Sequence, residues 1–401
     1  MITCRACATP IQEFFSLGKM PLVNAFRKKK DTAEKKYDLS VGFCPSCYLV
    51  QLMHHVNPSE LFEDYVYFSS VTHSILIHSQ KASDSFIKRF DLGPKSLVIE
   101  VGSNDGVHLQ FYKEKGVQVL GIDPAKNIAK IANKKGIKTL PEFFSLSLAK
   151  KLVDKNKKAD IFYGANVSAH VPQIVDFAKG VKTILKDKGT AIFESPYLMG
   201  LLENKFDTIY HEHVFYYSLI ALQNLYAKAG LEIYDIEFVE MQGGSLRIFL
   251  SRPGVYKISQ NVKKLAAEEI RFRLNKIDPY KKMNVNIERL KQDIISLLEK
   301  LKKEGKSIVA YSAPAKGVIL LNYFGVGKYL DFIVDKSKAK QGLYVPGTDM
   351  KVFAIDKIME EKPDYLFVLC WNIVDEVVRQ MGEYKKAGGK LIVPIPSIKI
   401  I

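Results

Sequence analysis

The sequence predicts an α/β protein that contains two doubly wound parallel sheets behind a small N-terminal domain. From about Leu97, short apolar segments typical of strands alternate with lysine-rich segments of helix length, and a second such series begins near residue 305. Two Cys-x-x-Cys pairs precede both series. With 401 residues, 47% of them hydrophobic and 25% charged, the chain is long enough for several domains and too apolar for a disordered protein.

Several classes of protein are disfavoured by composition. The sequence has no apolar run long enough to span a bilayer, and its first residues lack the basic and apolar regions of a signal peptide, so we expect a soluble, cytoplasmic protein. The net charge is +16, which is compatible with nucleic acid, a membrane surface or an anionic small substrate. Because the lysines are scattered, solvated helix faces account for most of this excess.

The four cysteines near the N-terminus are Cys4, Cys7, Cys44 and Cys47. Each Cys-x-x-Cys turn directs two thiolates to one centre, and two such turns supply the closed tetrahedral sulfur shell of a structural zinc site. The 36 residues between the pairs exceed the usual gap of a zinc ribbon. A disulfide or a redox pair therefore stays open, although neither has its expected sequence context.

The chain divides into four predicted segments. Residues 1–70 form the zinc-binding domain, and residues 71–255 form the first doubly wound sheet, to which LEIYDIEFVEMQGGSLRIFLSR adds antiparallel strands. Residues 256–304 are expected to be long amphipathic helices that connect this core to a second, Rossmann-like α/β domain at residues 305–401.

The first strand-to-helix turn, VIEVGSNDG, indicates a cofactor site. Gly102 opens the turn and is followed by Asn104 and Asp105, but the spacing is not the Gly-x-Gly-x-x-Gly of a dinucleotide site. Glu100, at the end of the strand, repels a diphosphate and suits an ammonium group. Asp123 ends the next strand, where a carboxylate can accept both ribose hydroxyls. An amino acid joined to a ribose is typical of S-adenosylmethionine (SAM), although a tight turn with a solvated aspartate is the alternative.

These motifs resemble those of class I SAM-dependent methyltransferases. Taken with the cysteine pairs and with ANVSAHV at 165–171, YHEHVFYYS at 210–218, GGSLR at 243–247 and SAPAKG at 312–317, the chain resembles sugar C-methyltransferases of the dTDP-4-keto-6-deoxyhexose 3-C-methyltransferase type. The resemblance runs essentially end to end. It implies a class I methyltransferase sheet between a zinc-binding domain and a C-terminal Rossmann-like domain, with SAM and a structural zinc ion as cofactors.

The resemblance also implies a reaction and its residues. Such enzymes methylate the carbon beside the ketone of a nucleotide-linked 4-keto-6-deoxy sugar, and this carbon must first lose a proton to a base. The resemblance points to His213 as the base, with Tyr210 and Glu212 in the same site and His170 as a contact to the substrate or its enolate. A metal pair or a structural loop is the alternative for the His-Glu-His segment, and a structural hydrogen bond is the alternative for His170.

Further contacts are expected for each ligand, each with a packing role as its alternative. Phe143 and Phe144 follow the third strand, where class I methyltransferases place the adenine, and Asn166 follows the fourth. For the substrate, we expect Tyr65 or Tyr67 at the sugar and Arg247 at an anionic group. The predicted contacts to the diphosphate are Ser312 and Lys316, at a strand-to-helix turn.

The main alternative function is a zinc-containing nucleic-acid methyltransferase that acts on RNA or DNA. Such enzymes usually carry an Asn-Pro-Pro-Tyr-like sequence after the fourth strand, whereas this chain has GANVSAH and no stripe of basic and aromatic residues. A non-catalytic binding protein is a second alternative, although it has no use for a base in the YHEH segment. We therefore expect a nucleotide-linked sugar as partner, with no nucleic acid and no membrane. The sequence contains no heptad repeat that indicates an oligomer.

Overall fold

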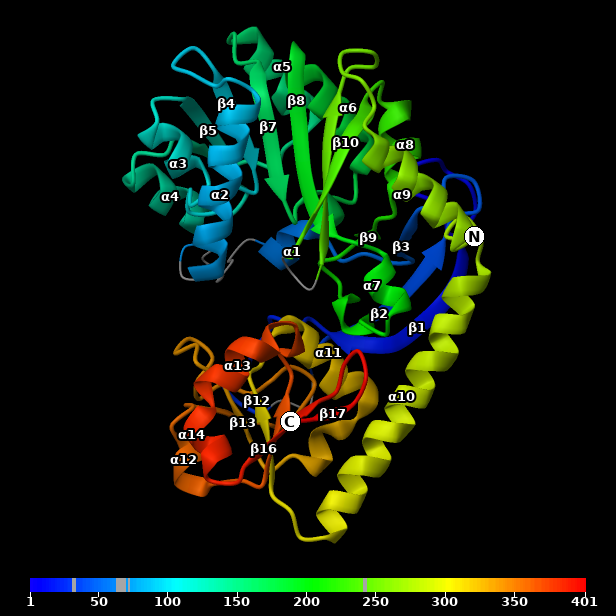
Figure 1. The fold of residues 1–401 in the computed structure, drawn as a ribbon, viewed down its shortest axis with the longest axis vertical. Helices are drawn as coiled ribbons and strands as arrows, with labels where there is room; N and C mark the ends of the chain where they lie inside the picture. Colours follow the sequence, from blue (N-terminus) through cyan, green and yellow to red (C-terminus); the bar gives the residue numbers. More distant parts are fainter. Residues whose placement is uncertain (31–33, 63–69, 71–72, 241–243) are drawn as a thin grey trace.

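The computed structural model describes residues 1–30, 34–62, 70, 73–240 and 244–401. Figure 1 shows two bodies, one built on the central sheet with the N-terminal domain at its side, the other formed by the C-terminal domain. The arrowheads of strands β7 and β8 point from the first body toward the second (Figure 1). No helix among the described residues is long and apolar enough to cross a membrane.

The N-terminal domain is built on an antiparallel sheet with the order β1-β2-β3-β9. Its fourth strand comes from much later in the chain, because β9 directly follows the YHEH segment and pairs with β3. The N-terminal domain and the core therefore share one sheet. The elements are β1 (Gln12–Pro21), β2 (Lys36–Phe43), β3 (Val50–Leu52), β9 (Phe215–Tyr216) and the short helix α1 (Pro58–Phe62).

The central sheet has seven strands in the order β10-β11-β8-β7-β4-β5-β6. Strands β4 to β8 are parallel, as expected for a doubly wound sheet, and β11 pairs antiparallel with both β8 and β10. The predicted antiparallel extension is therefore confirmed. The strands are β4 (Leu97–Val101), β5 (Gln118–Ile122), β6 (Thr139–Leu140), β7 (Ala159–Ala165), β8 (Leu185–Pro196), β10 (Glu232–Val239) and β11 (Ser245–Ser251).

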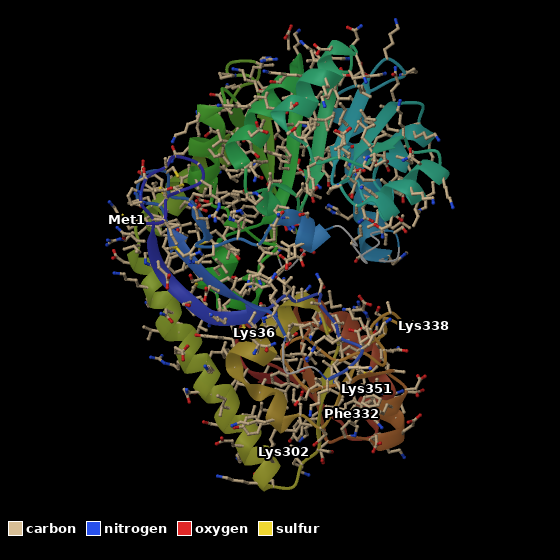
Figure 2. The ribbon with its side chains drawn as sticks, turned by 180° about the vertical axis from the view of Figure 1, so that it is seen from behind. Met1, Lys36, Lys302, Phe332, Lys338 and Lys351 are labelled. Atoms are coloured by element: carbon tan, nitrogen blue, oxygen red, sulfur yellow. The ribbon has the colours of Figure 1, made fainter. Side chains whose placement is uncertain are left out.

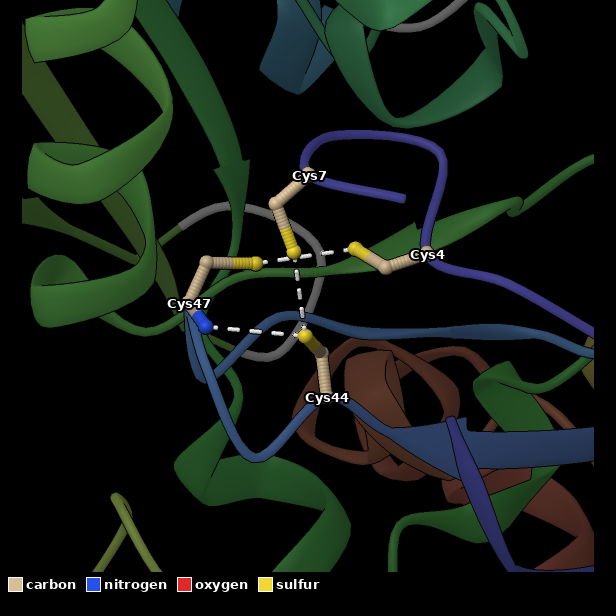
Figure 3. A group of neighbouring side chains, drawn as sticks. All are labelled: Cys4, Cys7, Cys44 and Cys47. Atoms are coloured by element: carbon tan, nitrogen blue, oxygen red, sulfur yellow. Dashed lines mark hydrogen bonds between the residues drawn. The ribbon is translucent and has the colours of Figure 1, made fainter. Parts of the chain in front are cut away.

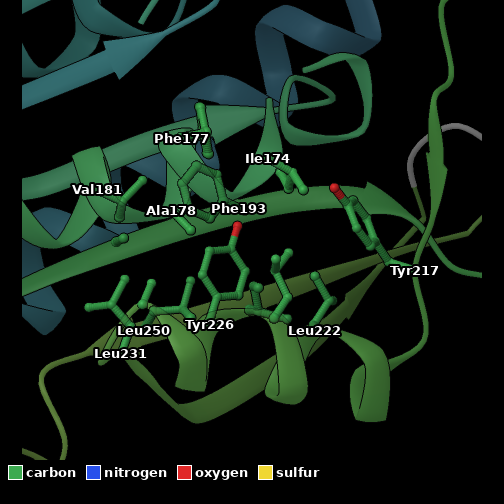
Figure 4. Packing of buried hydrophobic residues seen from close by; sticks show 14 of the residues in the cluster. Ile174, Phe177, Ala178, Val181, Phe193, Tyr217, Leu222, Tyr226, Leu231 and Leu250 are labelled. Carbon is green, nitrogen blue, oxygen red and sulfur yellow. The ribbon is translucent and has the colours of Figure 1, made fainter. Parts of the chain in front are cut away.

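Helices cover both faces of this sheet. One face packs against α2 (His73–Arg89), α3 (Leu109–Glu114) and α4 (Lys126–Lys134). The other packs against α5 (Leu146–Asp154), α6 (Ile174–Ile184) and α8 (Leu219–Lys228). Figure 4 shows this second core, where Phe177 of α6 and Tyr226 of α8 lie against Phe193 of β8. Burial on both faces explains why these strands are continuous apolar runs in the sequence.

Two helices connect the core to the C-terminal domain, within the segment predicted to be helical. They are α9 (Gln260–Arg271) and α10 (Asp278–Lys303). Along α10 the buried residues follow the three- and four-residue spacing of one helix face, and they join a core shared by the N-terminal sheet and the C-terminal domain. From behind, Met1 lies beside the upper part of this helix and Lys302 lies at its other end, next to the C-terminal domain (Figure 2).

The C-terminal domain has a six-stranded sheet in the order β14-β13-β12-β15-β16-β17, of which only β17 pairs antiparallel. Its five parallel strands have the same order as those of the central sheet, which confirms a Rossmann-like domain. The strands are β12 (Ile308–Tyr311), β13 (Ile333–Val334), β14 (Val352–Phe353), β15 (Tyr365–Val368), β16 (Lys390–Val393) and β17 (Lys399–Ile400). The helices are α11 (Ala315–Phe324), α12 (Lys357–Glu361), α13 (Val374–Gln380) and α14 (Gly382–Lys386).

Candidate active site

A cavity of about 890 Å³ opens at the carboxyl edge of the central sheet. The ends of β4, β5, β7 and β8 contribute to its wall, as do α2, the YHEH segment, the start of α11 and Asn24 of the N-terminal domain. The carboxyl edge of an open parallel sheet is where α/β proteins bind ligands. The volume of this cavity lies toward the upper end of the usual range for small-molecule sites, which favours two ligands or one large ligand.

Glu100 brings a buried carboxyl group into this cavity. It belongs to β4, and its Oε2 atom is buried with no hydrogen-bond partner in the described structure. Burial, and then the charges of Asp123, Asp105 and Glu194, raise the pKa of Glu100 well above its usual value. A cationic ligand such as an ammonium group offsets both effects, so the site fits the amino-acid end of SAM.

The turn after β4 holds Asp123 in a fixed orientation. The backbone N–H of Asn104 donates to Oδ2 of Asp123 at 2.9 Å, and the N–H of Ala125 donates to Oδ1 at 3.0 Å. Gly102 has φ +63°, and a Cβ atom there lies 2.3 Å from Cγ2 of Val167, so glycine is required at this position. Asp123 lines the cavity with its carboxylate oriented, as expected for a group that accepts from ribose hydroxyls.

We expect Asp123→Asn to weaken the binding of S-adenosylhomocysteine by about tenfold or more, because an amide cannot accept both ribose hydroxyls with the strength of a carboxylate. Calorimetric titration measures this loss. Asp105→Asn is the matched control, since its carboxylate accepts from Lys135 Nζ at 2.8 Å and does not line the cavity. Equal losses in the two variants contradict the ribose assignment.

The other predicted cofactor residues fall into two groups. Phe143, Phe144 and Asn166 line the cavity, and Oδ1 of Asn166 is buried without a partner in the described structure. Phe143 is 52% exposed, whereas Phe144 packs against Phe162 of β7. Phe143 is thus the one with a face available to an adenine. Asp105 is turned away, as its ion pair shows.

The YHEH segment places two of its side chains in direct contact. The hydroxyl of Tyr210 donates to Nε2 of His213 at 2.7 Å, and Nδ1 of His213 lies 2.8 Å from the carbonyl oxygen of Thr208. Because a carbonyl only accepts, the proton of neutral His213 is assigned to Nδ1, which leaves the Nε2 lone pair facing the cavity side. This is the tautomer that a base acting through Nε2 requires.

His170 lies beside this pair, with its ring centroid 5.0 Å from that of His213. Burial, and then the nearby His170 and Lys316, lower the pKa of His213 well below its usual value, and burial lowers the pKa of His170 to about 4. Because burial disfavours the charged form, both imidazoles are neutral at physiological pH.

Glu212 faces the same cavity, held by a residue of the N-terminal domain. Nδ2 of Asn24 donates to Oε1 of Glu212 at 2.6 Å. Burial raises the pKa of Glu212 to about 7. His211 points the other way, toward the carbonyl of Tyr37. The segment therefore contributes one imidazole, that of His213, to the cavity.

The raised pKa of Glu212 predicts how the stability of Glu212→Gln depends on pH. The folded protein holds this proton longer than the unfolded chain does, so the wild type loses stability as pH rises from the usual glutamate pKa to about 7. Glutamine does not ionise. We expect the stability of the variant relative to the wild type to increase by about 2 kcal/mol from pH 5 to pH 8. Denaturant unfolding at both pH values measures it, and a difference that does not change with pH contradicts the assignment.

Two half-buried lysines of the C-terminal domain also line the cavity. Lys316 lies in the first turn of α11, with Nζ 5.0 Å from the ring centre of Trp371. Lys340 donates to the carbonyl of Ala313 at 2.9 Å. Burial lowers the pKa of both lysines. Together with the N-terminus of α11, they fit a diphosphate.

The structure does not bring Arg247 or Ser312 to the cavity. Arg247 is buried, with Nε 2.9 Å from Glu194 and NH1 2.6 Å from Glu237, so its guanidinium group is already neutralised. The hydroxyl of Ser312 donates to Asp335. Neither residue lines the cavity, which corrects their assignment as substrate contacts. Tyr65, Tyr67 and Gly243 lie outside the described residues.

The four cysteines meet at one point. Their sulfur atoms all lie within 4.8 Å of one another, with Cys4 3.5 Å from Cys47 and Cys7 3.4 Å from Cys44 (Figure 3). A tetrahedron with Zn–S bonds of about 2.3 Å has edges of about 3.8 Å, so the cluster has the size of a zinc site. All four thiols are free, and each contact joins one Cys-x-x-Cys turn to the other.

Several cavity residues escaped prediction. They are Asn24, His78, Glu194 and Lys340. Each depends on a contact between segments far apart in the chain, such as the 188 positions between Asn24 and Glu212. For Glu194 a signal existed, because it follows an apolar strand, GTAIFES, at the same edge as Glu100.

Comparison with known proteins agrees with this arrangement. C-methyltransferase NovU of Streptomyces niveus is 33% identical over 404 residues, which cover 99% of this chain and 96% of the relative. The chain belongs to the C-methyltransferase family. Family models match three consecutive parts of this C-methyltransferase: a zinc binding domain at residues 4–62, a methyltransferase domain at 76–236 and a C-methyltransferase C-terminal domain at 240–396.

Solved structures also resemble the core of this C-methyltransferase. A SAM-dependent methyltransferase from Clostridium acetobutylicum is 12% identical, with a TM-score of 0.35 over 44% of this chain and 91% of that chain. Magnesium protoporphyrin IX methyltransferase from Synechocystis with bound S-adenosylhomocysteine is 13% identical, with a TM-score of 0.34 over 44% of this chain and 84% of that chain. The family models and the relative establish a SAM-dependent enzyme with a four-cysteine zinc site.

Proposed function

We propose that this enzyme methylates carbon 3 of a nucleotide-linked 4-keto-6-deoxy sugar. The observation that carries the proposal is the pair formed by His213 and Tyr210, which lies in one cavity with the SAM turn at Glu100 and Asp123. A carbon nucleophile requires a neutral base and a donor for the developing oxyanion, and these two side chains have that chemistry.

In the proposed reaction, Nε2 of His213 removes the proton from carbon 3, and the C–H electrons move into the adjacent ketone to give an enolate. The sugar takes the place of the Tyr210 hydroxyl at Nε2, so this hydroxyl becomes available to donate to the enolate oxygen. SAM supplies the electrophilic methyl group. The carbonyl of Thr208 stabilises the imidazolium ion that forms, because it accepts from Nδ1.

The nucleotide end of the substrate is assigned to the C-terminal domain. Lys316 and Lys340 lie in the part of the wall formed by that domain, away from the SAM turn, and they supply positive charge for a diphosphate. In this arrangement SAM binds at the edge of the central sheet and the diphosphate binds at the edge of the C-terminal sheet. We also propose that the enzyme acts in the cytoplasm, where cysteine thiols stay reduced and available to zinc.

The test uses SAM with a labelled methyl group and a panel of dTDP-, GDP- and CDP-linked 4-keto-6-deoxy sugars. We expect label in one or more of these sugars and none in the matched sugars whose ketone has been reduced to an alcohol, because the C–H bond is then not acidic. Total RNA is included in the same assay. Label in RNA and in no sugar supports the nucleic-acid alternative and refutes the proposal.

A further inference from the structure

A chain of alternating charges runs from the protein surface to the cavity. Each member contacts the next through a hydrogen bond or ion pair, at successive distances of 2.6, 3.2, 2.6, 2.9 and 2.8 Å. The members, in order, are Asp235, Arg89, Glu237, Arg247, Glu194 and His78. The chain crosses three adjacent strands, since Glu237 pairs in register with Arg247, and Arg247 with Glu194.

The inner end of this chain is deeply buried. The side chain of Glu194 is 3% exposed, and that of Arg247 is 8% exposed. Tyr163 also donates to Glu194, at 2.9 Å. Although burial alone raises the pKa of Glu194, the hydrogen bond to His78 and the charge of Arg247 lower it to about 2. Glu194 is therefore a fixed anion at every working pH.

This fixed anion orients His78, the last member, at the cavity wall. Nε2 of His78 donates to Glu194 at 2.8 Å, because an ionised carboxylate only accepts. Nδ1 is then the ring atom left for a ligand, and it donates to an anion in the imidazolium form, whose positive charge Glu194 offsets. The side chain of His78 remains 19% exposed although its partner is almost completely buried. A charge chain that is buried at its inner end and terminates on a partly exposed imidazole suits a residue that is held for binding.

The amino-acid end of SAM carries two charges, and Glu100 on the cavity wall suits only the positive one. Glu100, Tyr163 and Glu194 belong to neighbouring strands and face the same helix layer, from which His78 of α2 projects. The carboxyl group of Glu100 suits the ammonium group. The carboxylate of SAM needs a donor on the same side of the sheet.

Other cationic or imidazole groups on the cavity wall are less suited to this carboxylate. Lys316 and Lys340 belong to the C-terminal domain, and His170 and His213 surround Tyr210. His108 lies on the correct side, but it packs against Tyr163 with ring centroids 4.1 Å apart, and burial lowers its pKa to about 3. His108 is therefore neutral, and among the described residues of the cavity wall His78 is the group that remains.

We propose that His78, oriented by Glu194, binds the carboxylate of SAM and so selects ligands that retain the amino-acid end. This role depends only on the cofactor and is independent of the proposed sugar. The backbone pairing of β8, β10 and β11 and their apolar packing already hold these strands together. The charge chain therefore serves ligand binding, and the fold does not require it.

Three ligands test the proposal by calorimetry: S-adenosylhomocysteine, its decarboxylated analogue, which keeps the ammonium group, and methylthioadenosine, which lacks the whole amino-acid end. The wild-type protein should bind S-adenosylhomocysteine about tenfold or more tightly than the decarboxylated analogue. This arm needs no variant. Equal affinity for the two ligands overturns the proposal.

The second arm compares His78→Gln with His73→Gln, an exposed histidine on the same helix. His78→Gln should reduce the preference for the carboxylate to about twofold or less, with the affinity for methylthioadenosine unchanged, while His73→Gln keeps the wild-type preference. A preference that persists in His78→Gln, or an equal loss for all three ligands, overturns the proposal. If His78→Gln loses its cooperative thermal transition, His78→Asn is measured in its place.

Discussion

His213→Ala should reduce methyl transfer by roughly 10²–10⁴-fold, the contribution of a positioned general base. Its affinity for S-adenosylhomocysteine should stay unchanged, because the SAM turn lies on β4 and β5 and does not depend on the His213 ring. The measurement combines turnover with deuterium exchange at carbon 3 of the sugar in heavy water. Exchange reports deprotonation without methyl transfer and should fall to the same extent as turnover.

Two variants of neighbouring residues serve as comparisons. Tyr210→Phe removes the proposed donor to the enolate oxygen and keeps the His213 ring, so exchange should slow less than in His213→Ala. His170→Asn should also slow exchange less than His213→Ala does. If His213→Ala exchanges normally and His170→Asn abolishes exchange, His170 is the base and the roles of the two histidines are reversed.

Cys44→Ser should cause the largest loss of stability, on the order of 4 kcal/mol or more, because it opens a closed zinc shell. The loss should also reach the active site. Strand β3 follows the second Cys-x-x-Cys turn and pairs with β9, and the N–H of Leu52 donates to the carbonyl of Val214, the residue after His213, at 2.9 Å. Metal analysis, thermal unfolding and carbon 3 exchange measure the three consequences.

Cys370→Ser is the matched control for this prediction. Cys370 is buried like Cys44, but it lies after β15 in the C-terminal domain, outside the cluster. It should retain one zinc ion per chain and wild-type exchange. A Cys44→Ser protein that keeps full zinc content and stability contradicts the structural role of the site.

The two parallel sheets could be predicted because their strands are buried on both faces and therefore appear as apolar runs at regular intervals. β9 could not be predicted in the same way. It has two residues, Phe215 and Tyr216, and it exists because β3, more than 160 positions earlier, offers an open edge. Strands β1, β2 and β3 pair with their neighbours in the chain, whereas the pairing of β3 with β9 depends on that distant segment.

The candidate site was predictable where its residues follow strand ends, as with Glu100, Asp123 and His170. It was not predictable where a side chain has a partner on a neighbouring strand. Arg247 looked like a free cation in the sequence, but the register of β11 places it between two carboxylates. Aligning the two predicted antiparallel strands in this register would have placed Glu237 opposite Arg247.

The long helix α10 limits how this enzyme can be recombined with its relatives. Its 26 residues extend about 39 Å, and its buried stripe contacts Phe14 and Phe43 of the N-terminal sheet through Tyr280, then the C-terminal domain through Leu298 and Leu301. In a hybrid protein joined after Lys303, the C-terminal domain of a relative packs against the α10 of this enzyme, whose end does not match it. In a hybrid joined before Asp278, the α10 of the relative packs against the N-terminal sheet of this enzyme, which it does not match. Exchange of the C-terminal domain between family members therefore requires grafting both contact sets, and this domain does not behave as an interchangeable module.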